Sequence, residues 1–158
     1  MMSRRGFTLI EAIIAIVVLS LAVPATMAMI HDATVARTDS VLTTRAAWLA
    51  GTISEQILAD ATSTHADLGM SAFEDPATYL HAPGTGLFAR LSSVVELYEN
   101  YGMSCEVDIG PVVSATFTPS GDAARNIYRQ ITVTVRWGRA SGPPATMPIS
   151  FIVVDGAS

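Results

Sequence analysis

The chain opens with one long apolar run, continues with an amphipathic stretch and ends in segments of alternating polarity. Residues 7–30 carry a single charge, Glu11. As a helix they would span about 36 Å at about 1.5 Å per residue, which exceeds a bilayer core of about 30 Å. After this run apolar positions recur with a period near 3.6, and no proline occurs before Pro76. The pattern predicts one helix from about Thr8 to about Ala61.

The second half of this helix is expected to pack an apolar stripe on a globular domain. We predict Trp48 to be a core residue, because it falls in line with the other apolar positions. The stripe comprises Val35, Val41, Leu42, Trp48, Leu49, Ile53, Ile57 and Leu58.

The rest of the chain predicts a long loop followed by strands. Residues 63–86 are rich in Gly, Pro, Asp, Ala and Thr, which is typical of a loop with one short helical turn. Apolar residues within 87–101 share one face of a possible helix. Period-two alternation predicts strands at 104–109, with an extension through 112–117, and at 131–137 and 149–153, with a loop at 138–148. The fold class expected is α+β, a long N-terminal α-helix packed on a small antiparallel sheet.

The composition indicates that part of the chain lies outside water. Half of the residues are apolar and 15% are charged, against about 25% in soluble domains. The net charge is −5, and no basic run follows Arg5, which argues against a nucleic-acid partner. Arg4 and Arg5 precede the apolar run and favour a cytoplasmic N-terminus.

The apolar run permits three hypotheses: a single-pass anchor, a cleaved secretory signal or a helix that assembles with other helices. Val23-Pro24-Ala25 offers the small residues that signal peptidase prefers. Glu11 argues against the first two, because a carboxylate in a membrane helix costs about 2.5–3.5 kcal/mol. Neither an anchor nor a signal gains from that cost, so Glu11 requires a partner.

The heptapeptide Arg5-Gly6-Phe7-Thr8-Leu9-Ile10-Glu11 resembles the type IV prepilin motif. The resemblance implies that a membrane-embedded prepilin peptidase cuts between Gly6 and Phe7 and N-methylates Phe7. It also implies that Glu11 of one subunit pairs with the new N-terminal amine of its neighbour inside an apolar filament core. Pro24 is expected to kink or locally melt the helix. A proline in the second half of the span is common in this family.

Residues 45–58 resemble the helix of minor pseudopilins of type II secretion and of minor type IV pilins. The resemblance implies a single-pass inner-membrane protein with a cytoplasmic N-terminus and a periplasmic domain. Other pilins or pseudopilins are its expected partners, with an assembly platform and ATPase acting indirectly. Residues 96–101 resemble the acidic-aromatic loop of many pseudopilins, so a loop stays an alternative to a helix there. The expected parts are a leader at 1–6, an assembly helix at 7–30, an amphipathic helix at 31–62 and a globular domain at 63–158.

Chemistry-bearing residues do not form a recognisable active site. His31, His65 and His81 lack metal-ligand spacing, and Cys105 is the single cysteine, typical of a buried packing residue. Glu74, Asp75, Glu96 and Glu99 match no calcium loop and favour a solvated acidic surface over a calcium site. We expect no metal, no cofactor and no enzymatic activity. The alternative to a pilin-like subunit is an exported or anchored periplasmic ligand-binding module.

Overall fold

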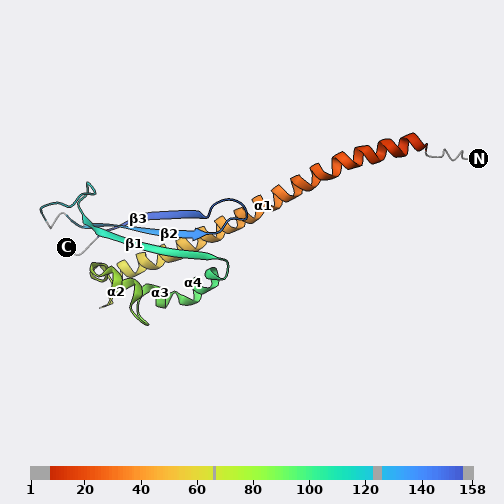
Figure 1. The fold of residues 1–158 in the computed structure, drawn as a ribbon. Coiled ribbons are helices and arrows are strands. Elements are labelled where there is room, and N and C mark those ends of the chain that lie inside the picture. The colour runs from red at the N-terminus through yellow and green to blue at the C-terminus, as the bar shows by residue number, and fades with distance from the viewer. Residues whose placement is uncertain (1–7, 66, 123–125, 155–158) are drawn as a thin grey trace, which may run out of the picture. The chain divides into compact units, whose positions relative to one another are not determined.

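The computed structural model describes residues 8–65, 67–122 and 126–154 (Figure 1). Helix α1 runs Leu9–Ala61, as the apolar periodicity predicts, and Pro24 lies inside it with helical backbone on both sides. Among the described residues, α1 is the one helix long and apolar enough to cross a membrane. The predicted kink at Pro24 stays a prediction.

The chain divides into two compact units, Met1–Ser40 and Val41–Ser158. In the first unit the apolar side chains of α1 are exposed, from Leu9 at 81% to Val23 at 50%. None of the residues in the most apolar stretch of α1 is buried within this chain. Exposed apolar surface of this extent needs a lipid or protein environment.

The second unit contains a three-stranded antiparallel sheet in the order β1-β2-β3. Its strands are β1 (Met103–Val113), β2 (Tyr128–Trp137) and β3 (Ala145–Val154). The predicted antiparallel sheet and the α+β class are therefore confirmed. The register of β1 on β2 shifts between Ile109 and Val112, where Gly110 and Pro111 interrupt the pairing.

Two strand boundaries differ from the prediction. The first strand ends at Val113 and does not extend to Phe117, because the backbone turns there and Phe117 has a φ of 57°. The third strand begins at Ala145, inside the predicted loop 138–148. Pro148 suggested a loop, but β3 lies at the sheet edge, where a residue without an N–H is tolerated.

Short helices precede the sheet. They are η1 (Met70–Glu74), α2 (Pro76–His81), α3 (Leu87–Arg90) and α4 (Ser92–Glu99). Asp75 caps α2 by accepting a hydrogen bond from the Thr78 backbone N–H at 3.2 Å, and Pro76 occupies the first helical position. The region 87–101 is thus mostly helical, which decides between the two alternatives.

The core of the second unit lies where α1, the short helices and the sheet meet. Figure 1 shows the three strands side by side, with the C-terminal part of α1 and helices α2–α4 next to them. Fully buried members of the cluster are Ala46, Leu49, Ala50, Ile53, Ile57, Phe73, Leu87, Ile131, Val133 and Val135.

The prediction that Trp48 is a core residue is wrong. Its side chain is 69% exposed, whereas the adjacent Leu49 is 1% exposed. Successive residues of a helix point about 100° apart, which places Trp48 about 140° from the buried Ile53 and about 180° from the buried Ile57. Val41 and Leu58, which belonged to the predicted stripe, are also exposed.

Candidate functional site

Helix α1 starts at a reciprocal pair of side chains, Thr8 and Glu11. The Thr8 backbone N–H donates to Glu11 Oε2 at 2.9 Å, and the Thr8 hydroxyl donates to the same oxygen at 2.7 Å. In return the Glu11 N–H donates to Thr8 Oγ1 at 3.4 Å. This is a capping box, in which two otherwise unpaired backbone donors of the first helical turn are satisfied.

The capping box gives Glu11 a partner within its own chain. A carboxylate has about four lone-pair sites, and the two Thr8 bonds both end on Oε2. The helix N-terminus adds a favourable partial positive charge beside Glu11. Thr8 was not predicted as a partner of Glu11, although Thr-x-x-Glu before an apolar run is the pattern of a capping box.

Gly6 and Phe7, the predicted processing residues, lie outside the described residues. Residues 1–23 match the family model of the prokaryotic N-terminal methylation motif. This match supports the type IV pilin-like family. The matched range includes Thr8 and Glu11. The long N-terminal helix and the small antiparallel sheet are consistent with the fold that the resemblance implies. No curated protein and no solved structure matches the chain.

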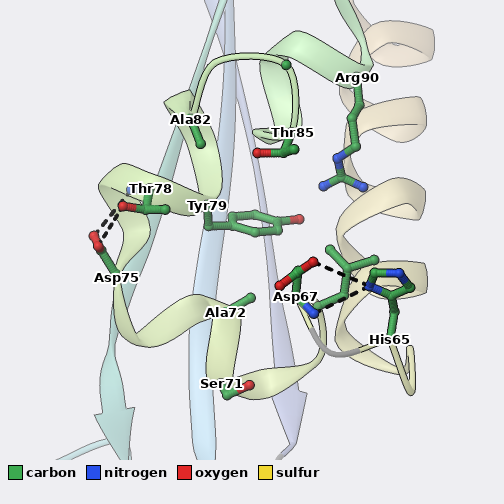
Figure 2. Close-up of a pocket in the computed structure, with 12 residues that line it drawn as sticks. His65, Asp67, Ser71, Ala72, Asp75, Thr78, Tyr79, Ala82, Thr85 and Arg90 are labelled. Atoms are coloured by element: carbon green, nitrogen blue, oxygen red, sulfur yellow. Dashed lines mark hydrogen bonds and ion pairs between the residues drawn. The ribbon is translucent and has the colours of Figure 1, made fainter.

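The second unit, Val41–Ser158, which we call the globular unit, holds a pocket of about 660 Å³ beside α2 and α3. Figure 2 shows Tyr79 and Arg90 reaching from these two helices into the same space. The Asp67 backbone N–H, which donates to His65 Nδ1 at 3.4 Å, and the bond of the Thr78 hydroxyl to Asp75 lie at its edge. Its volume is within the range of small-molecule sites.

The polar groups of Tyr79 and Arg90 are bound to Asp60, near the end of α1. Arg90 donates from Nη1 to Oδ1 at 2.9 Å and from Nη2 to Oδ2 at 2.6 Å, and the Tyr79 hydroxyl donates to Oδ2 at 2.7 Å. Gln56 Nε2 adds a bond to Oδ1 at 2.9 Å. We call these four residues the Asp60 cluster. Asp60 itself is 2% exposed.

The protonation of the Asp60 cluster suits a structural role. Burial opposes ionisation of Asp60, but hydrogen bonds from Arg90, Tyr79 and Gln56 outweigh it, and its pKa is lowered. Burial, followed by the bond to Asp60, raises the pKa of Tyr79. At neutral pH the carboxyl stays ionised and the phenol stays neutral, so neither is set to exchange a proton with a ligand.

Other residues considered from the sequence occupy separate places. His81 stacks on Phe88 with ring centroids 5.3 Å apart. Burial raises the pKa of Cys105, which keeps its thiol protonated. Within the described parts of the chain, no group of three or more His, Cys, Asp or Glu side chains is placed to hold a metal ion.

Proposed function

We propose that this protein is a minor pseudopilin or minor pilin, a structural subunit of a filament of the type II secretion or type IV pilus kind. The observation that carries the proposal is the methylation motif at residues 1–23 running directly into an exposed apolar helix. Prepilin peptidase would cut between Gly6 and Phe7 and methylate Phe7. The assembly helix 7–30 would hold the subunit in the inner membrane until an assembly platform and ATPase incorporate it.

In this proposal the N-terminus is cytoplasmic and the globular unit is periplasmic. Residues 1–6 form the leader, residues 31–62 the amphipathic part of the helix and residues 63–158 the exported domain. Neither nucleic acid nor a cofactor takes part, and the protein is not an enzyme. Pro24 supplies a weak point where the helix can bend on leaving the bilayer.

Glu11 has two roles in the proposed assembly. Within the chain it completes the capping box with Thr8. Between chains its carboxylate, with lone pairs beyond those that Thr8 uses, accepts the methylated amine of a neighbouring Phe7. The two charges are costly alone in an apolar filament core and tolerable together.

Mass spectrometry of the mature N-terminus, on protein isolated from its own host, tests this proposal. A chain beginning at methylated Phe7 is the expected result. A chain beginning near Thr26 would overturn the proposal and favour an exported binding module, for which the 660 Å³ pocket is the candidate ligand site.

Three variants separate the two roles of Glu11. Glu11→Val removes both roles, Thr8→Val removes the cap and keeps the carboxylate, and Ser20→Val is a control on the same exposed helix. All three should insert into the membrane. Glu11→Val should lose most filament incorporation and Thr8→Val much less, while Ser20→Val should match the wild type. Unchanged incorporation of Glu11→Val would contradict the pairing between subunits.

A further inference from the structure

The two edges of the sheet are protected to different extents. In the order β1-β2-β3, the outer strands β1 and β3 each leave one row of backbone N–H and C=O groups without a strand partner among the described residues (Figure 1). β1 carries Glu106 and Asp108, and its register shifts between Ile109 and Val112. Charges and irregular register are features that keep an edge from pairing with another chain. β3 has no charged residue and no register shift, and its one protective residue is Pro148.

Pro148 indicates which backbone groups of β3 face outward. It lies opposite Thr134 without a register shift, so its nitrogen, which has no hydrogen to donate, points away from β2. In an antiparallel pair, residues that bond the partner strand alternate with residues that point away from it. Ser150, Ile152 and Val154 follow Pro148 at even spacing and therefore offer their N–H and C=O groups at the open edge. Beyond Pro148, neither a charge nor a second proline interrupts this edge up to the end of β3.

A depression of about 290 Å³ lies beside the same part of the edge. Three of its five lining residues are apolar, and the five are Phe117, Gln130, Ser150, Phe151 and Ile152. The Phe117 side chain is 54% exposed and that of Ile152 is 43% exposed. Phe117 has a φ of 57°, which is uncommon for a large side chain, and its N–H donates to the Ser114 carbonyl at 2.9 Å. The loop after β1 thus holds an aromatic side chain next to the open edge.

We propose that the edge of β3 beyond Pro148 is a docking surface for an extended, uncharged segment of a different protein, which pairs with it as a fourth strand. Unpaired backbone N–H and C=O groups in a row are complementary to another strand, and main-chain hydrogen bonds supply the affinity of such an addition. The depression at Phe117 would receive one apolar side chain of the added strand, since alternate side chains of a strand point to one face. Such an interface goes beyond the proposed function and does not depend on processing at Gly6.

The direction of α1 argues against a second copy of this chain as the occupant. A symmetric dimer through β3 pairs the two edge strands antiparallel, about a two-fold axis perpendicular to the sheet. Residues 41–61 of α1 pack on one face of the sheet, so this axis reverses their direction in the second copy. Two subunits anchored in one membrane through residues 9–30 need this part of α1 to run in the same direction. A strand from a different protein has no such restriction.

Binding of a synthetic peptide to the full-length protein in detergent micelles tests the proposal. The probe is a fluorescently labelled peptide of alternating valine and threonine, flanked by lysines for solubility. The control is the same peptide with every valine and threonine amide N-methylated, which keeps the side chains and removes the hydrogen-bond donors of a strand. We expect the fluorescence anisotropy of the first peptide, but not of the second, to rise with protein concentration. Equal binding of both peptides, or binding of neither, would overturn the proposal.

Two substitutions at the open edge separate strand addition from adhesion to apolar surface. Ser150→Pro removes one outward N–H in the way that Pro148 does, and should weaken binding of the unmethylated peptide about tenfold or more. Ser150→Ala is the matched control: it loses the hydroxyl, which lies 2.9 Å from that of Thr132, keeps the N–H and should bind as the wild type does. Ile152→Lys keeps the backbone and adds a charge at the edge, so it should weaken binding even if Ser150→Pro does not fold.

The variants also define the results that contradict the proposal. Unchanged peptide binding in folded Ser150→Pro and in Ile152→Lys would mean that the edge of β3 is not the docking surface. Light scattering of the same samples measures the size of the protein in the micelle. A wild-type dimer that Ile152→Lys dissociates would make a second copy the occupant and would overturn the choice of partner.

Discussion

Arg90 holds Asp60 through both carboxylate oxygens, with Nη1–Oδ1 at 2.9 Å and Nη2–Oδ2 at 2.6 Å. The two residues belong to different elements, the end of α3 and the end of α1. A bidentate pair of this kind fixes orientation as well as distance. The Asp60 cluster therefore holds helices α2 and α3 against the end of α1.

Removing Arg90 is expected to destabilise the globular unit. Arg90→Ala leaves the Asp60 carboxylate buried with two of its hydrogen bonds lost, and such a change costs about 3–5 kcal/mol in a buried pair. Because the Arg90 side chain is 27% exposed, we expect a loss near the lower end of that range. The free energy of unfolding is measured by urea titration in detergent. The signal is the fluorescence of the buried Trp137 in a Trp48→Phe background.

The exposed pair of Arg136 and Glu106 is the matched control. Its nitrogen–oxygen distance is 2.8 Å, close to that of the Asp60 pair, but both side chains are more than half exposed. Glu106→Ala should change the free energy of unfolding by less than about 1 kcal/mol. Similar losses in Arg90→Ala and Glu106→Ala would show that burial of the Asp60 cluster contributes little.

Acidification should weaken the globular unit through Asp60. Its folded-state pKa lies below the ordinary value of 3.8, so its contribution to stability is present above that value and is lost as the pH falls through the folded pKa. The free energy of unfolding should therefore drop more steeply below about pH 4 in the wild type than in Asp60→Asn. Asp75 has a pKa lowered by its bonds to Thr78 and is unchanged in both proteins. Parallel pH profiles of the two proteins would argue against this role for Asp60.

Two glycines should respond to alanine in opposite directions. A Cβ at Gly86 would lie 2.6 Å from the Ala82 nitrogen and 2.9 Å from the Leu80 and Ala82 carbonyl oxygens. Gly86→Ala should therefore cost about 1–3 kcal/mol. Gly51 lies inside α1 with open space around it, and Gly51→Ala should stabilise the unit by up to about 1 kcal/mol. Thermal unfolding of the two variants in one detergent checks both signs, and a stabilised Gly86→Ala would refute the close approach.

The capping box at the start of α1 should protect the first helical turn. Thr8→Ala removes the hydroxyl that bonds Glu11, at a cost of about 1 kcal/mol, while Thr8→Ser keeps it. Amide hydrogen exchange in the first turn should then speed up about fivefold in Thr8→Ala, and little in Thr8→Ser. Equal exchange in all three proteins would mean that the apolar environment alone holds the turn.

Much of the architecture was predictable because it depends on local periodicity. The extent of α1 from residue 9 to 61 follows from apolar residues spaced at helical intervals and from the absence of a proline between Pro24 and Pro76. The three strands follow from alternation in the same way. The ends of the strands could not be predicted in this way. Pro148 is tolerated within β3 because β3 is an edge strand, and strand order is not a local property of the sequence.

The amino-acid sequence by itself determined the character of the N-terminal segment. The motif, the apolar run and the charged Glu11 all lie within one continuous stretch of the chain there. Tertiary structure alone decided which side of α1 is covered. It placed Leu49 in the core and left Trp48 outside, and it brought Asp60, Tyr79 and Arg90 together from three elements. The physical reason is that a helix with apolar residues on more than one side is compatible with several packings. The sheet, through the shape of its buried face, selects one.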